Sequence, residues 1–407
     1  MKKTELKKYA SLIARTGAGI VKGDEVIIQA ELDQPEFVEM LVTECYRAGA
    51  KKVTVEWSHQ PLQKLHVRYR SLKTLSSVED WEVEKLRRRT EVLPAIIYLL
   101  SEDPDGLSGI NQEKNSKAAQ ARFKVIKPLR DAMENKYKWC IAAVPGVKWA
   151  KKVFPGMTSY RAVESLWEAI FKTCHMGNDP IAEWDNHNRD LAERCEHLNR
   201  AGIVSLEYKS SNGTDLTVGM IENCLFMGGG EYTEGGEYFN PNMPTEEVFI
   251  TPMRGKAEGI VYATKPLSYR GELIENFSIR FEDGRAVEVH AERGEDLLRQ
   301  MISMDDGASY LGECALVPWN SPINNTGLLF YNTLFDENAC CHLALGRGFS
   351  NCLKDYEKMT FEECTAAGIN DSMIHEDFMI GAPDLSITAK LKDGTEMPIF
   401  RDGTWAF

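Results

Sequence analysis

The chain has 407 residues, of which 43% are hydrophobic and 27% charged, as expected for a folded globular protein long enough for two domains. Its formal net charge of -13 excludes the basic surface that nucleic-acid-binding proteins normally carry. No stretch approaches the roughly 20 apolar residues of a membrane span, and the charged N-terminus indicates an amphipathic helix rather than a secretion signal. We therefore expect a cytoplasmic protein without membrane or nucleic-acid partners.

The first half of the chain alternates strand-like and helix-like segments. An amphipathic helix is predicted over 34–50, because apolar residues recur there at helical spacing, and a second strongly helical stretch covers 159–201. Four segments are predicted to be strands from their short apolar or β-branched runs: 21–30, 51–57, 95–100 and 139–145. This rhythm predicts an α/β N-terminal domain over residues 1–201 with a mostly parallel sheet.

Such a sheet often binds nucleotides, but the motifs for that function are missing. No GxGxxG follows the first predicted strand, and no GxxxxGK[ST] occurs in the chain. The ten cysteines include no CxxC pair, so a zinc ribbon is not expected either.

The pattern changes after residue 201. Strand-like alternation and turns such as Asp283-Gly284 predict a β-rich α+β domain over residues 202–407. Within it, the Gly-, Tyr- and Asn-rich segment 226–244 has no period and is predicted to be a long, functional loop. The residues that point to chemistry also lie in this half, so we expect it to be the catalytic domain.

Two of the eight histidines lie in patterns that point to metal binding. His375 and Asp377 form a His-x-Asp pair, and residues two apart on a strand face the same side, so both can reach one ion while Glu376 points away. His342 lies in the apolar run CHLALGRGF. A histidine in such a run is either a hydrogen-bonded core residue or a ligand, and both readings stay open.

Three glutamates border apolar runs in the same half. Glu246 and Glu247 precede the run VFI, and Glu313 precedes the run CALV. A carboxylate at the mouth of a buried strand is costly unless it is paired, protonated or bound to a cation. Taken singly, Glu313 is explained as well by a cap or an arginine pair, and Glu246 by solvent exposure.

Two histidines with three carboxylates are the mixture that a two-metal hydrolase needs. In such sites two ions activate a water molecule as the nucleophile. Nitrogen and oxygen ligands suit zinc, cobalt or manganese and also admit magnesium, so the residues do not select the ion. A nearby carboxylate, Glu246 or Glu313, would carry the proton to the leaving amine.

Four segments of the C-terminal half, in order and spacing, resemble the thermophilic aminopeptidase family, also called the M29 peptidases: NMPTEEVFITP, GECALVPWNSPI, LFYNTLFDENACCHLALG and HEDFMIG. The α/β half and the C-terminal PIFRDGTWAF are similar to the family too, so the resemblance covers most of the chain. It implies a homodimer with enclosed active sites that releases N-terminal amino acids from peptides. It implies five metal ligands: Glu247, Glu313, His342, His375 and Asp377.

One position departs from the family pattern HxAxGxxY. Phe349 occupies the place of the tyrosine, and it lacks the hydroxyl that could donate a hydrogen bond to the reacting carbonyl or oxyanion. Losing one such donor costs roughly 3 kcal/mol of transition-state stabilisation. The pattern therefore predicts a metal-competent but slow enzyme, unless another side chain supplies the donor; four are candidates: Arg347, Tyr232, Tyr238 and Tyr331.

Two alternatives follow. A non-catalytic or weakly active member would keep the metals and the peptide-sized cavity but lack turnover. A two-metal phosphoesterase would use similar ligands, but it would need Lys or Arg clamps and more Asp ligands, which the motifs do not show.

Overall fold

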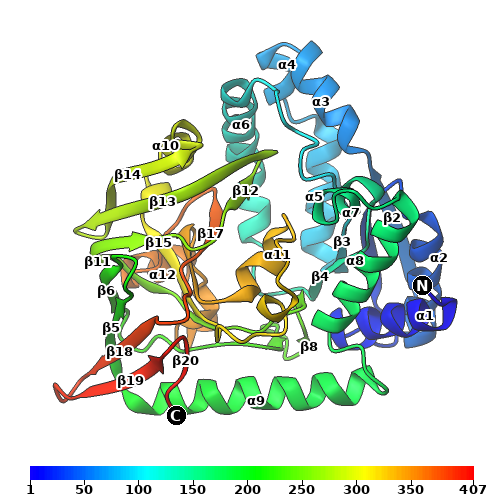
Figure 1. Ribbon diagram of the computed structural model, residues 1–407. Helices are drawn as coiled ribbons and strands as arrows, with labels where there is room; N and C mark the ends of the chain where they lie inside the picture. The colour runs from blue at the N-terminus through cyan, green and yellow to red at the C-terminus, as the bar shows by residue number, and fades with distance from the viewer. The chain divides into compact units, whose positions relative to one another are not determined.

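The computed structural model describes residues 1–407, and their internal contacts divide them into two compact units (Figure 1). The first unit comprises Met1–Asn188 and Gly229–Thr245, and the second comprises Arg189–Gly228 and Glu246–Phe407. Helix α9 (Pro180–Ala201) contains the point of division. The boundary of an independently folding domain after Ala201 stays a prediction.

The first unit is built on one parallel sheet with the order β2-β1-β3-β4-β9, and every pair of neighbours in it is parallel. Its strands are β1 (Glu25–Glu31), β2 (Lys52–Ser58), β3 (Ala95–Leu100), β4 (Trp139–Ala143) and β9 (Asn242–Met243). Eight helices accompany them: α1 (Lys3–Leu12), α2 (Pro35–Ala48), α3 (Gln60–Tyr69), α4 (Leu72–Ser76), α5 (Asp80–Val92), α6 (Gln112–Asp131), α7 (Val147–Val153) and α8 (Ser159–Thr173). The parallel α/β sheet predicted from the alternation is confirmed.

Two segments differ from the prediction. The first strand begins at Glu25 rather than Val21, because a turn at Lys22-Gly23, with Gly23 at φ 101°, interrupts the chain there. The segment expected to be a long loop contains the hairpin β7–β8 (Glu231–Tyr232 and Tyr238–Phe239) and then β9. β9 pairs with the buried strand β4, so this late segment of the chain completes the N-terminal sheet.

The second unit is rich in antiparallel strands, as predicted, and has two sheets (Figure 1). The nine strands of the larger sheet are β5 (Ile203–Lys209), β6 (Asp215–Met220), β11 (Pro252–Tyr262), β12 (Leu267–Tyr269), β13 (Glu272–Glu282), β14 (Arg285–Arg293), β18 (Ser386–Leu391), β19 (Glu396–Arg401) and β20 (Thr404–Trp405). The smaller sheet has the order β10 (Val248–Ile250), β15 (Leu311–Leu316), β16 (His342–Gly346), β17 (His375–Met379). Three α-helices join the strands: α10 (Glu295–Ile302), α11 (Thr333–Asp336) and α12 (Phe361–Ala367).

One face of the smaller sheet belongs to the core of this unit. Leu316, Leu343 and Phe378 are almost fully buried in one apolar cluster with residues of the larger sheet, and the Phe378 ring lies 5.9 Å from that of Phe277 on β13. Side chains alternate between the two faces of a strand. The opposite face of the same strands therefore carries Glu313, His342 and Asp377, which are polar residues of the candidate site. No helix of the chain has the length and apolar character that a bilayer crossing requires.

Candidate metal centre

The alternation along three strands brings the polar side chains to one face of the smaller sheet. Across this sheet Glu313 is paired with Ala344, and Ala344 with Asp377, so the two carboxylates flank a small residue. His342 lies two residues before Ala344, and His375 two residues before Asp377, so both imidazoles share that face. Ala344 leaves open the space between the two carboxylates.

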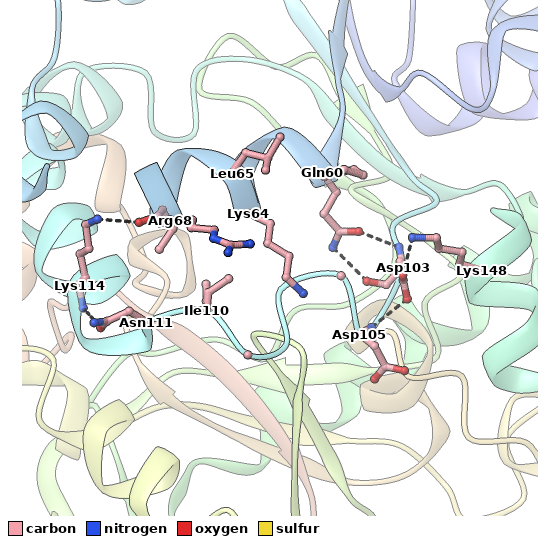
Figure 2. Close-up of a pocket in the computed structure, with 14 residues that line it drawn as sticks. Gln60, Lys64, Leu65, Arg68, Asp103, Asp105, Ile110, Asn111, Lys114 and Lys148 are labelled. Carbon is pink, nitrogen blue, oxygen red and sulfur yellow. Dashed lines mark hydrogen bonds and ion pairs between the residues drawn. The ribbon is translucent and has the colours of Figure 1, made fainter. Parts of the chain in front are cut away.

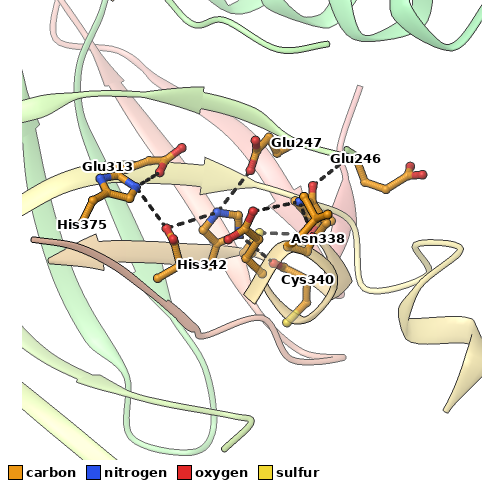
Figure 3. Close-up of polar contacts among 12 residues, drawn as sticks. Glu246, Glu247, Glu313, Asn338, Cys340, His342 and His375 are labelled. Atoms are coloured by element: carbon orange, nitrogen blue, oxygen red, sulfur yellow. Dashed lines mark hydrogen bonds and ion pairs between the residues drawn. The ribbon is translucent and has the colours of Figure 1, made fainter. Parts of the chain in front are cut away.

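The imidazoles and carboxylates meet at their polar ends. His342 Nε2 lies 3.2 Å from Glu247 Oε2 and 3.9 Å from Asp377 Oδ1. His375 Nε2 lies 3.0 Å from Glu313 Oε2 and 3.4 Å from Asp377 Oδ1 (Figure 3). Glu247 reaches the cluster from the residue just before β10, which pairs with β15.

The second nitrogen of each imidazole is held by a backbone carbonyl. His375 Nδ1 donates to the Arg347 carbonyl at 2.7 Å, and His342 Nδ1 to the Cys340 carbonyl at 3.4 Å. A proton fixed on Nδ1 leaves the lone pair of Nε2 directed at the cluster. Histidines that bind metals are oriented in this way.

The cluster is almost closed to water. Glu247, Glu313, His342 and Asp377 are each between 1% and 6% exposed. Burial, together with repulsion from Glu247, raises the pKa of Glu313 to about 7, although a hydrogen bond from His375 works against the rise. Without an ion, the two imidazoles are the only positive charges next to these carboxylates.

The imidazole pKa values show how strongly the carboxylates attract positive charge. Burial alone would lower the pKa of His342, but the hydrogen bond and charge of Glu247 raise it to about 9. The pKa of His375 is also raised well above its usual range, against its burial, by Asp377 and Glu313. Burial would raise the pKa of Asp377, but the charge of His375 lowers it. The cluster therefore favours cations.

The residues present fit a divalent cation. Asp377 Oδ1 is buried and accepts no hydrogen bond, and no Lys or Arg forms an ion pair with Asp377, Glu247 or Glu313. Two groups each bring their ligand atoms within 4.8 Å of one another: Glu247, Glu313 and His342 form one, and Glu313, His375 and Asp377 form the other. Mixed imidazole and carboxylate ligands of this kind suit zinc and neighbouring transition metals.

Comparison with known proteins agrees with this site. The model of a family described as thermophilic metalloprotease (M29) matches residues 2–405. The chain belongs to this family. It is 39% identical to aminopeptidase AmpS of Bacillus subtilis (strain 168) and 40% identical to aminopeptidase T of Thermus thermophilus, each over 405 residues that cover 99% of this chain and 98% of the relative. The structure of wild-type AmpT from Thermus thermophilus matches it with a TM-score of 0.90 at 39% identity, and both chains are covered in full.

The M29 membership confirms the family resemblance, and the AmpT match confirms the fold class. The family is a metalloprotease family, so its reaction uses divalent metal and acts on peptide substrates. Membership does not assign the individual ligands of this chain. The geometry of the cluster makes these five residues candidate ligands.

The structure brings five of the six candidate site residues of this M29 member together and leaves one apart. Glu246 is buried, and its backbone N–H donates to Asn338 Oδ1 at 2.7 Å. Its carboxylate points away from Glu247 and His342 (Figure 3). Successive side chains of an extended segment point in opposite directions. Because Glu247 points into the cluster, Glu246 points away from it. Glu313 meets His375 instead of the arginine considered as its alternative partner.

A fourth carboxylate at the cluster, Glu337, was not predicted from the sequence. Glu337 lies in the short turn that follows α11, and its pKa is raised well above the usual range by burial and by repulsion from Asp377, Glu247 and Glu313. Its side chain hydrogen-bonds Asp377. The signal available in the sequence was an acidic pair inside the otherwise apolar segment LFDENACCHLALG.

Phe349, the departure from the M29 pattern, lies at this site. Its ring centroid is 4.8 Å from that of His375 and 5.3 Å from that of Phe249. Among the proposed substitute donors, Arg347 lies over the Phe361 ring at 4.9 Å and 3.7 Å from Asp371. Two others, Tyr232 and Tyr238, form the β7–β8 hairpin of the first unit.

Proposed function

We propose that this chain is a metalloaminopeptidase that releases N-terminal amino acids from peptides with two divalent ions. The observation that carries the proposal is the pair of ligand groups that share Glu313 on one face of the sheet. One shared carboxylate between two sets of ligands is the arrangement that a two-metal hydrolase needs. The named relatives, aminopeptidase AmpS and aminopeptidase T, support the substrate class.

In this proposal Glu313 would contribute to both sets of ligands, because its carboxylate belongs to both groups. Glu247 and His342 complete one set of ligands, His375 and Asp377 complete the other, and the ions are zinc, cobalt, manganese or magnesium. When bound, such ions supply Lewis acidity toward the peptide carbonyl and toward a water molecule.

The remaining roles belong to the chain itself. The carbonyls of Arg347 and Cys340 hold His375 and His342 in the tautomer that keeps each Nε2 free to bind. Glu337 orients Asp377 through their hydrogen bond. Proton transfer to the leaving amine stays with Glu246 or Glu313, as expected from the sequence. A Glu246→Gln variant separates the two, because it keeps every ligand and loses activity only if Glu246 is the shuttle.

The test of the ligand set is His375→Ala, with His290→Ala as the matched control, because His290 lies exposed on β14 of the same unit. Bound metal is measured by elemental analysis, and activity by release from leucyl and arginyl chromogenic amides. We expect His375→Ala to lose metal and activity together while the control keeps both. Unchanged metal content and activity in His375→Ala would contradict the assignment of His375 as a metal ligand.

A non-catalytic or weakly active member is the second candidate, and the position of Phe349 beside His375 favours it. Its signature is wild-type protein that binds zinc, cobalt or manganese but does not trim a short peptide.

A homodimer is part of the proposal as well, and sedimentation velocity tests it. The cytoplasmic location stays a prediction.

A further inference from the structure

The first unit contains a cavity of about 670 Å³ that shares no residue with the candidate metal centre. Its walls are α3, the loop between β3 and α6, the first turn of α6 and the start of α7 (Figure 2). The volume falls within the roughly 300–1,000 Å³ of small-molecule pockets. A single inorganic ion would not fill it.

The cavity lies where parallel α/β sheets bind ligands. The chain passes from β1 to β2 on one side and then places β3 on the other side of β1, so the strand order reverses between β1 and β3. Ligands of such sheets bind beyond the carboxyl ends of the strands near that reversal. Gln60 follows the carboxyl end of β2 and Asp103 that of β3, and both line the cavity.

The lining carries excess positive charge in a chain whose net charge is -13. Its two carboxylates already have partners: Asp103 pairs with Lys148 of the lining at 3.2 Å, and Asp105 with Lys152 at 2.8 Å. Three further cations of the lining have no carboxylate partner: Lys64, Arg68 and Lys114. The lining thus contains cationic side chains without a carboxylate partner, whereas both of its carboxylates are already in ion pairs.

Two of these cations stand one turn apart on α3. Lys64 and Arg68 are at i and i+4, and Figure 2 shows both charged ends between the helix and the loop of Ile110. Like charges at this spacing repel and weaken a helix. A bound anion between them would turn the repulsion into two charge-assisted hydrogen bonds.

The walls are fixed in place before any ligand arrives. The Gln60 side chain donates to the Asp103 carbonyl at 3.0 Å and accepts from the Asp103 N–H at 3.1 Å. The loop packs so closely there that a Cβ on Gly106 would lie 2.1 Å from Gln60 Oε1. Lys64 Nζ donates to the Ser108 carbonyl at 2.7 Å, and Lys114 Nζ donates to the carbonyls of Val67 at 2.7 Å and Arg70 at 2.5 Å. An ammonium has three donors, so both lysines keep capacity for a ligand.

We propose that this cavity binds a small organic anion with two or more negative charges, carried by phosphate or carboxylate groups. The guanidinium of Arg68 and the ammonium of Lys64 bind the oxyanion, and Leu65 and Ile110 contact an apolar part of the ligand. This site is independent of the metal centre and adds a second ligand to the protein.

The test is titration calorimetry of the full, metal-loaded chain with phenyl phosphate and with phthalate. Each probe carries two negative charges on an aromatic ring, phenyl phosphate on one phosphate group and phthalate on two carboxylate groups. Their comparison separates phosphate from carboxylate ligands. The variant is Lys64→Gln/Arg68→Gln. The control is Lys3→Gln/Lys7→Gln, which removes two exposed cations at the same spacing from α1.

We expect saturable binding of at least one probe, weakened about 10-fold or more in the Lys64/Arg68 variant and unchanged in the control. Arg68→Gln alone keeps the Lys64 contact to Ser108 that fixes the loop, so it reports on the ligand without disturbing the wall, and we expect at least about 3-fold weaker binding. No saturable binding of either probe, or equal binding by both double variants, would overturn the proposal.

Discussion

The aromatic ring of Phe349 lies against the imidazole of His375, with 4.8 Å between their centroids. The residue that departs from the family pattern therefore contacts a candidate metal ligand directly. Its backbone N–H donates to Thr251 Oγ1 at 2.8 Å, which fixes the start of the turn that follows β16. A tyrosine here would add a hydroxyl to a ring that already contacts His375, and it would leave the five candidate ligands unchanged.

Phe349→Tyr should raise kcat for a chromogenic amide by about 10²-fold and leave metal content unchanged, because it restores one donor to the reacting oxygen. Phe361→Tyr is the control, since Phe361 stacks with Arg347 instead of a ligand. An equal gain in both variants, or none in Phe349→Tyr, would show that the missing phenol does not limit turnover.

Glu337→Gln should not destabilise the metal-free protein, but it should weaken metal binding. Without metal, the amide removes one of four crowded carboxylates, so the melting temperature should stay level or rise. With metal, the loss of the carboxyl group that orients Asp377 should weaken metal affinity about 10–100-fold. Competition with a metallochromic chelator measures the affinity, with exposed Glu357→Gln as the control.

The metal-free protein should lose stability as the pH rises. The pKa of His342 is raised from 6.5 to about 9, so its stabilising contribution is complete below pH 6.5 and is lost as the pH rises through 9. The pKa of Glu313 is raised from 4.5 to about 7, so its protonated form favours folding at low pH and its ionisation destabilises the fold through pH 7. Deprotonation of either group therefore lowers the stability of the metal-free protein as the pH rises.

Bound metal should remove much of this dependence, because a divalent ion replaces the protons. Thermal melts at pH 6, 7.5 and 9, with chelator and with zinc or manganese, measure the effect. We expect the rise in melting temperature on metal addition to grow with pH. A rise that shrinks toward pH 9 would contradict the assignment of these groups as ligands.

Asn338→Ala should destabilise the protein by about 1–3 kcal/mol, since it leaves the buried Glu246 N–H without its acceptor. The segment that carries Glu247 would also lose an anchor, so metal affinity should fall with stability. Urea unfolding gives the free energy of unfolding, and Asn325→Ala, at an exposed position, serves as the control. Destabilisation equal to that of the control would mean that this hydrogen bond does not anchor the segment.

The sequence by itself determined the local features of this protein. Short apolar runs predicted β3 with its exact bounds, Ala95–Leu100, because a strand buried on both faces has no polar position. Alternation correctly placed His375 and Asp377 on one face and Glu376 on the other, where burial raises the pKa of Glu376 to about 7. Four segments in the order and spacing of the family identified it, even though several of their residues, taken singly, fit an ordinary core or surface role.

Only the tertiary structure decided what depends on contacts between distant segments. The hydrogen bond of Glu337 to Asp377 and the pairing of β9 with β4 join residues far apart in the chain, and no local period records such contacts. The cavity between α3 and α6 is likewise formed by side chains that look like ordinary surface cations in the sequence. Local propensity and periodicity specify elements and faces, whereas long-range packing specifies which faces meet.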